Sequence, residues 1–181
     1  MEVFWTKGYE GASLDDLLKA MGKINPPSFY AAFGSKEQLF FEAVDLYVGT
    51  VGNRPIEALE AASTAREGIA AMLREAVGVF CGPPPGCVVF LSAINCAPAS
   101  KSIQDRMRGY RARVPEVMRK RLERGVIEGD VPEQADLGAI VSVYATFLHG
   151  LPLQARDGVA REVLLAGAAG AMAAWDRLVA S

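Results

Sequence analysis

The sequence is short of the residues from which most active sites and disulfide frameworks are built. Among its 181 residues it has one histidine, His149, and three cysteines, Cys81, Cys87 and Cys96. It contains no Cys-x-x-Cys pair, no glycine-rich phosphate loop and no metal-ligand spacing, so it predicts neither a metal nor a cofactor. An odd number of cysteines fits reduced, buried thiols better than disulfides. We therefore do not expect an enzyme; an all-helical enzyme that uses His149 or a cysteine is the most distant alternative.

Long apolar runs are also absent. No stretch reaches the roughly 18 uninterrupted apolar residues of a membrane-spanning helix, and the start lacks the basic and apolar regions of a signal peptide. We expect a cytoplasmic protein with no membrane partner. Hydrophobic residues nevertheless make up 51% of the chain, and the mean hydropathy is +0.17. This richness indicates an apolar surface that another molecule covers.

Helical periodicity is present along most of the chain. The clearest pattern is Lys101 to Glu128, an amphipathic helix whose arginines alternate with acids as on a solvated face. The apolar stretch Cys87 to Ala97 has no second strand to pair with, so we expect a buried helix that Pro98 ends. The sequence predicts an all-α fold. The other expected helices run from about 36 to 51, 56 to 62, 66 to 81, 133 to 156 and 159 to 180.

Residues 13 to 40 carry the functional signal. Ser13 is a good N-cap for a short helix from about 14 to 21, and Gly22 ends that helix. Pro26 and Pro27 suit the first turn of a second short helix, which ends at Gly34, and Ser35 caps a third in a capping-box pattern with Gln38. Two short helices joined by a glycine-containing turn form a helix-turn-helix, and the N-terminal end of the second helix would face base edges in DNA. The candidate contacts at that end are Asn25, Pro26, Pro27, Ser28 and Tyr30, the last through a phosphate.

The segments SLDDLLKAMG and INPPSFYAAFGSKEQLF resemble the DNA-binding domain of the TetR family of bacterial regulators. The preceding FWTKGYEGAS is similar to the end of the family's first helix and its Gly-Tyr turn, although that helix is shortened here to about Glu2 to Lys7. The resemblance implies DNA contacts from Ser13 and Lys36 in addition to those above. The residues that match the family pattern are Ser13, Tyr30, Phe33, Ser35, Lys36, Glu37 and Leu39.

The same resemblance implies the rest of the domain organisation. Residues 1 to 47 would form the helix-turn-helix domain, and 48 to 181 a helical domain for effector binding and dimerisation. The last two helices would pair with their copies in a four-helix bundle, which spaces two recognition helices for a palindromic operator. The expected function is a ligand-responsive regulator, a repressor by family resemblance, that a small apolar effector releases from DNA. Candidate effector contacts are Met and aromatic residues that suit an adaptable apolar pocket or simply fill a core: Met72, Phe80, Phe90, Met107, Tyr110, Met118, Tyr144 and Phe147.

The distribution of charge gives only partial support for DNA binding. From Leu17 to Lys36 there are three lysines and no acid, a local basic patch of the kind that DNA binding uses. Residues 1 to 50, however, hold four lysines against seven acids, a net charge of −3. A helical ligand-binding dimer with lost or weakened DNA binding is therefore the main alternative.

Overall fold

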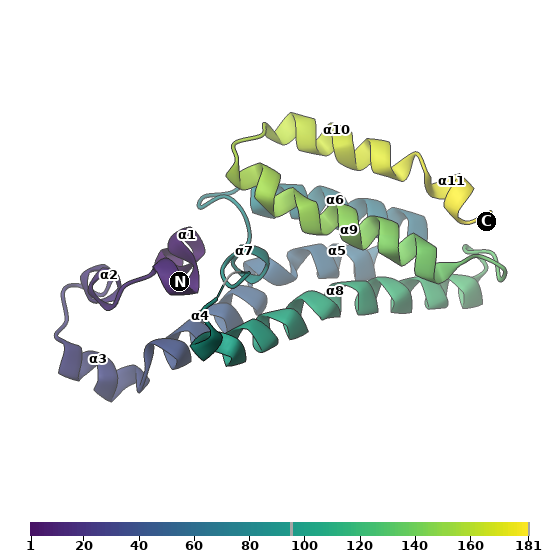
Figure 1. Cartoon of the computed structure of the whole chain (residues 1–181). Helices are drawn as coiled ribbons and strands as arrows, with labels where there is room; N and C mark the ends of the chain where they lie inside the picture. The colour runs from purple at the N-terminus through teal and green to yellow at the C-terminus, as the bar shows by residue number, and fades with distance from the viewer. Residues whose placement is uncertain (95, 181) are drawn as a thin grey trace.

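The computed structural model describes residues 1 to 94 and 96 to 180, and all regular secondary structure within these ranges is helical. The first four helices form a small body at one end of an elongated molecule, and α4 leads from it into the larger helical body (Figure 1). These helices are α1 (Glu2–Gly11), α2 (Leu14–Ala20), α3 (Pro26–Phe33) and α4 (Lys36–Val48). The predicted fold class, an N-terminal helix-turn-helix body followed by a helical domain, is confirmed.

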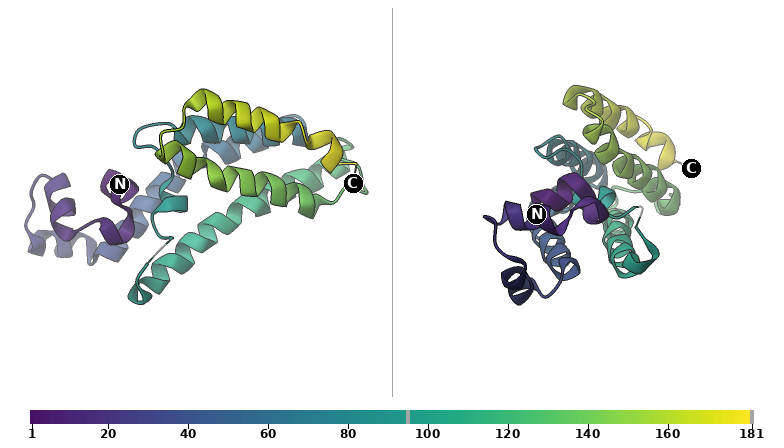
Figure 2. Two further views of the ribbon diagram at one scale, coloured as in Figure 1. Left: turned by 45° about the horizontal axis from the view of Figure 1, so that its top comes forward. Right: turned by 60° about the vertical axis from the view of Figure 1, so that its left-hand side comes forward.

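The larger body is a stack of long helices. In both Figure 1 and Figure 2, α10 lies along α9 on the outside of the stack, while α8 runs along the opposite side. Helices α6 and α9 form its centre, since α6 contacts α5, α8, α9 and α10. Its helices are α5 (Arg54–Ala61), α6 (Ala65–Phe80), α7 (Val88–Leu91), α8 (Lys101–Glu128), α9 (Leu137–Arg156), α10 (Arg161–Met172) and α11 (Trp175–Leu178).

Local signals explain most of the boundaries. Thr64 forms a capping box with Glu67 at the start of α6, Asp136 accepts from the Ala139 N–H at the start of α9, and Gly129 ends α8 in the left-handed region with φ 82°. Helix α8 occupies the predicted range Lys101–Glu128, with Pro115 inside it. Capping thus sets helix ends that the hydrophobic pattern leaves open by a few residues.

Four expectations about helices need correction. The buried helix expected over 87 to 97 is only one turn, Val88–Leu91, because the run has no polar stripe and Ile94 is exposed; Asn95 lies outside the described residues. The last two expected helices also differ: the first begins at Leu137 rather than 133, and the second is divided by a turn at Ala173 into α10 and α11. Helix α4 ends at Val48 rather than 51.

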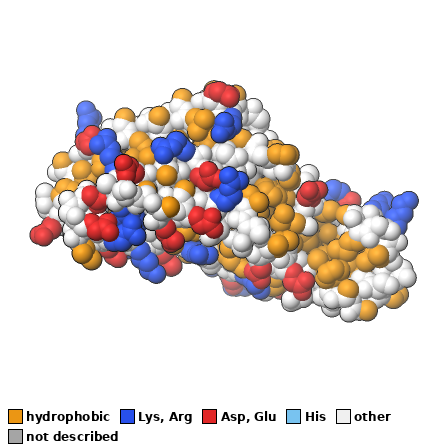
Figure 3. All heavy atoms as spheres, turned by 180° about the vertical axis from the view of Figure 1, so that it is seen from behind, with side chains coloured by type: hydrophobic (Ala, Val, Ile, Leu, Met, Phe, Trp, Pro, Cys, Tyr) orange, Lys and Arg blue, Asp and Glu red, His pale blue; other side chains and the backbone are white. Residues whose placement is uncertain are grey.

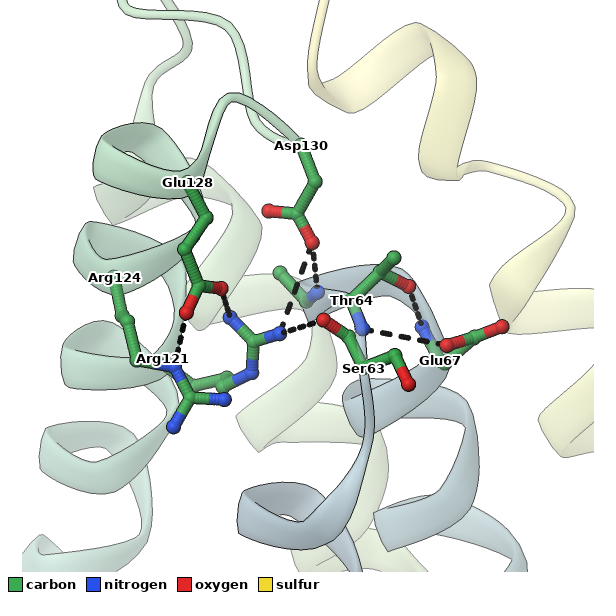
Figure 4. A network of polar contacts seen from close by, with 8 residues as sticks. Ser63, Thr64, Glu67, Arg121, Arg124, Glu128 and Asp130 are labelled. Atoms are coloured by element: carbon green, nitrogen blue, oxygen red, sulfur yellow. Dashed lines mark hydrogen bonds and ion pairs between the residues drawn. The ribbon is translucent and has the colours of Figure 1, made fainter.

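Buried Arg121 links two connections between helices, the one between α5 and α6 and the one between α8 and α9. The Arg121 side chain is 1% exposed; it donates to the Ser63 carbonyl at 3.2 Å and to Glu128 at 3.3 Å (Figure 4). Its Nη2 lies 3.7 Å from Asp130, whose carboxylate also accepts from the Ala65 N–H at 2.5 Å. The network therefore fixes the α8–α9 turn to the start of α6.

Helix α9 is long and apolar enough to cross a membrane by length and composition alone. It packs against α6, α8 and α10 in the stack.

Candidate DNA-binding surface and effector cavity

Helix α3 presents a short exposed face. The Asn25 side chain accepts from the Ser28 N–H at 2.8 Å, which caps the helix, and Pro26 and Pro27 occupy its first turn. Phe29 is fully buried and holds the helix to its neighbours, whereas Tyr30 is 51% exposed. Asn25, both prolines and Ser28 are exposed as well. The structure thus brings the predicted α3 residues together on one surface.

Helix α2 and its cap are held by a cluster of ion pairs. The Ser13 hydroxyl accepts from the Asp16 N–H at 3.1 Å, and the Asp16 carboxylate accepts from the Ser13 N–H at 3.0 Å, so the capping box is complete. Lys7 lies 2.6 Å from the same carboxylate; this hydrogen bond, followed by those from Ser13, holds the pKa of Asp16 well below its usual range. Lys19 is paired with Asp15 at 2.6 Å. The local acids therefore neutralise two of the four N-terminal lysines.

The other two lysines differ from each other. Lys36 is half-buried, with its Nζ 4.5 Å from the centroid of the Tyr9 ring, and desolvation lowers its pKa. Ser35 caps α4 by accepting from the Gln38 N–H, but the Gln38 side chain donates to Glu42 at 3.2 Å, so the reciprocal half of the expected capping box is not formed. Lys23 is exposed in the turn before α3, where φ is 61°, and no ion pair to its ammonium exists among residues 1–94 and 96–180.

A small cavity lies between α4, α5, α6, α7, α8 and α9. Its volume is about 60 Å³, and its lining is mainly apolar. Four of the eight predicted effector residues line it: Met72, Phe80, Phe90 and Tyr110. The other four do not. Met107, Met118 and Tyr144 are fully buried in the core around it, and Phe147 is half-buried beside Gly167.

Sequence reasoning missed several lining residues. Tyr47 and Val48 come from α4, and Asn53, Cys87 and Arg113 from segments that are far apart in the chain. The Tyr47 hydroxyl donates to the Cys87 sulfur at 3.2 Å, and burial raises the pKa of both groups. The helix that connects the two bodies thus forms part of the cavity wall. No local sequence signal marks a residue that lines a cavity through such a long-range contact.

Known proteins resemble the chain both in the sequence of the N-terminal body and in the overall fold. Residues 1–43 match the family of bacterial regulatory proteins named after tetR. The chain is 30% identical over 169 residues to the HTH-type transcriptional repressor BdcR of Escherichia coli K12, which covers 92% of this chain and 80% of BdcR. It belongs to the TetR family.

Two further relatives support this assignment. The chain is 26% identical over 182 residues to the HTH-type transcriptional repressor ComR of Escherichia coli K12, covering 99% of this chain and 86% of ComR. It is also similar to a cysteine mutant of the TetR family transcriptional regulator CifR, solved with 26bp double-strand operator DNA, at 45% identity and a TM-score of 0.92 over 96% of this chain and 92% of that one. This TetR-family chain is accordingly a DNA-binding transcriptional regulator and not an enzyme.

His149 and the three cysteines pack against neighbouring side chains, and the buried His149 Nε2 has no hydrogen-bond partner among the described residues. The His149 ring lies 4.7 Å from that of Phe90, and burial, followed by the Arg111 charge, lowers its pKa. All three cysteines are free, and burial raises the pKa of each thiol. A raised thiol pKa keeps the unreactive protonated form at neutral pH.

Polar contacts join the DNA-binding body to the larger body. Asp45 on α4 accepts from Tyr110 and, at 2.8 Å, from Arg106, both on α8. Glu10 accepts from the Ser100 hydroxyl and from the Ala97 N–H, and these two bonds lower its pKa.

The surface of the two bodies differs in character. Seen from behind, hydrophobic side chains gather on the N-terminal body and near its junction with the rest, whereas charges of both signs are scattered over the larger body (Figure 3).

Proposed function

We propose that this chain is a homodimeric repressor that binds a palindromic operator and that a small, mainly apolar effector releases. The observation that carries the proposal is the position of α4, because one continuous helix follows the exposed α3 surface and also supplies Tyr47 and Val48 to the cavity. The repressor names of ComR and BdcR and the operator complex of CifR support it. A cytoplasmic location is part of the same proposal.

The DNA contacts would come from the N-terminal end of α3 and its surroundings. The Ser28 hydroxyl and the amide NH2 of Asn25, whose oxygen caps the helix, are small polar groups that can meet base edges. Pro26 and Pro27 offer apolar contact. The Tyr30 hydroxyl is exposed and suits a phosphate, as does the N-terminus of α2 at Ser13. Lys36 would approach a phosphate from its position over Tyr9, and its partial burial keeps it ordered.

The dimer would form through α9 and α10. Val143 and Leu153 on α9 are 41% and 54% exposed, and Val163 on α10 is 59% exposed. Alanine and glycine occupy much of the remaining exposed surface of α10, which allows close approach of a partner helix. An apolar surface on two adjacent helices is suited to a self-complementary four-helix interface.

Effector action would use the contacts between α4 and α8. Tyr110 lines the cavity and also donates to Asp45 on α4. An occupant that moves Tyr110 would break this bond and change the orientation of α4, and with it the spacing of the two α3 helices in the dimer. The effector would thus favour the state that does not fit the operator.

The experiment is a fluorescence-anisotropy titration against DNA from the region upstream of the gene and against binding-selected sequences. The expected result is tight binding to one palindrome with a steep loss of affinity as salt rises. Ser28→Ala should relax sequence preference, and Tyr30→Phe should weaken binding to all sequences alike. The absence of binding to any selected sequence would refute the proposal and favour the alternative, a ligand-binding dimer without DNA recognition.

A further inference from the structure

Several polar groups of the effector cavity are already satisfied by the protein. The Tyr47 hydroxyl is bonded to the Cys87 sulfur, and the Tyr110 hydroxyl to Asp45. A ligand would have to break these bonds to use either hydroxyl, which costs most of what it would gain. The chemistry of the occupant must therefore be read from the groups that have no partner.

Asn53 supplies one such group. Its amide nitrogen donates to Glu57 at 2.8 Å, and this bond fixes which side of the amide is oxygen. The amide oxygen is buried and has no hydrogen-bond partner among the described residues. Asn53 also lines the cavity, so a donor group of an occupant that reaches this buried oxygen would satisfy it.

An arginine of α8, Arg113, supplies the second group without a partner in the part of the chain that the structure describes. Arg106 is paired with Asp45 at 2.8 Å, Arg108 with Asp105 at 3.1 Å, and Arg111 donates to the Val89 carbonyl at 3.0 Å. Arg113, which lines the cavity, makes no ion pair or hydrogen bond within the described chain.

The position of Arg113 places this charge at the opening. It lines both the cavity and a shallow hollow that it shares with Arg106, Gly109 and Tyr110. The carboxylate of Asp45 at this hollow already accepts hydrogen bonds from Arg106 and Tyr110, and it makes none with Arg113. The mouth of the cavity thus carries a guanidinium without a matching anion, beside a mainly apolar interior.

We infer that the effector is a small carboxylic acid with an apolar body, its carboxylate on Arg113 and a hydrogen-bond donor near the Asn53 oxygen. This inference rests on the proposed function and names its ligand class. A planar guanidinium binds a carboxylate through two parallel hydrogen bonds. A carboxylate at the mouth also competes with Asp45 for Tyr110 and Arg106, so the ligand's own charge weakens the contact between α4 and α8.

The test compares three one-ring probes by isothermal titration calorimetry on the full chain: phenylacetate, its uncharged analogue phenylacetamide, and mandelate, which adds a hydroxyl donor to phenylacetate. Phenylacetate should bind at least about ten-fold more tightly than the amide, since a charge-assisted bond is lost in the amide. Mandelate should bind a few-fold more tightly than phenylacetate.

Matched variants test whether the carboxylate binds at Arg113 and the hydroxyl donor at Asn53. Arg113→Gln should lower the affinity for both acids about ten-fold and leave that for the amide unchanged. Arg108→Gln, on the exposed side of the same helix and paired with Asp105, is the control and should change neither. Asn53→Ala should remove the advantage of mandelate over phenylacetate; its thermal unfolding, measured alongside, shows that the protein is folded.

Two results would overturn the inference: equal binding of acid and amide, or acid binding that Arg113→Gln does not weaken. Failure of both acids to bind at about 10 mM, far above a Kd of the expected order, would overturn it too. Operator binding of the same preparation is measured separately, so a failure of the ligand class is distinguished from a failure of the repressor proposal.

Discussion

Replacement of Lys23 by glutamine should make operator binding less sensitive to salt. Lys23 lies in the turn before α3, is exposed, and has no ion-pair partner within residues 1–94 and 96–180. Lys7 and Lys19 are instead held by Asp16 and Asp15 at 2.6 Å. A free cation next to the recognition helix is the one that displaces a counterion from DNA without first breaking an ion pair.

The magnitude follows from counterion release. Each phosphate contact contributes about 0.9 to the slope of log affinity against log salt concentration. The proposed dimer would place two copies of Lys23 on the operator, so Lys23→Gln should make the slope less negative by about 1.8. At about 0.1 M salt the same two contacts correspond to a loss of affinity of up to roughly 60-fold. Glutamine keeps a flexible side chain of similar reach at the left-handed backbone position, so the turn is not perturbed.

The assay is anisotropy of a labelled operator at several salt concentrations between about 50 and 200 mM. Lys101→Gln is the matched control: Lys101 is exposed on the larger body and paired with Asp105, so the slope of this variant should equal that of the wild type. If the slope of Lys23→Gln also equals that of the wild type, Lys23 contacts no phosphate and the reasoning from free and paired lysines is wrong.

Three further predictions concern stability. Arg121→Met should cost about 2 kcal/mol in the free energy of unfolding, because it leaves the Ser63 carbonyl and Asp130 with fewer partners, whereas exposed Arg124→Met should cost under about 0.5 kcal/mol; urea denaturation compares them. Phe29→Ala, at a fully buried position, should cost roughly 3–5 kcal/mol and abolish operator binding, as followed by thermal unfolding and anisotropy. The pKa of Asp16 is depressed, so its contribution is present above the ordinary carboxyl pKa and is lost as pH falls below it; urea unfolding between about pH 7 and 3 should show a smaller loss for Asp16→Asn than for the wild type.

The fold was predictable where residues of fixed conformational preference mark the ends of periodic segments. Pro26 and Gly34 bound α3, and Gly129 ends α8, so these helices follow from local chemistry. The segment 87 to 97 offered neither a polar stripe nor an internal stop, and only tertiary packing makes its helix end at Leu91. Periodicity locates a helix with two distinct sides; it does not locate one in a uniformly apolar run.

The exposed residues of the candidate DNA side were predictable, but only half of the predicted cavity residues line the cavity. Asn25, Pro26, Pro27 and Ser28 form the cap and first turn of α3, so their proximity follows from the sequence alone. The cavity joins Tyr47 to Cys87, 40 residues away, and to Arg113 on a third segment. Arg113 is an exposed residue of an amphipathic helix, and nothing in the sequence separates it from the paired arginines beside it. Its lack of an ion pair among the described residues becomes visible only when the positions of Asp45 and Asp105 are known.

The energy of the contact between α4 and α8 determines what kind of effector can act through it. The Asp45 and Arg106 side chains are 50% and 41% exposed, so solvent screens their attraction, and an exposed pair of this kind contributes less than about 1 kcal/mol. The bond from Tyr110 adds an amount of similar order. A ligand can shift the equilibrium only by the difference in its affinity for the two states, typically about 1–3 kcal/mol. A small molecule with a single charge-assisted bond supplies a difference of that size, whereas it would not suffice against the several bonds made by a buried side chain such as Arg121. The polar contact at the mouth of the cavity is therefore weak enough to be reversed by the ligand class proposed above for Arg113.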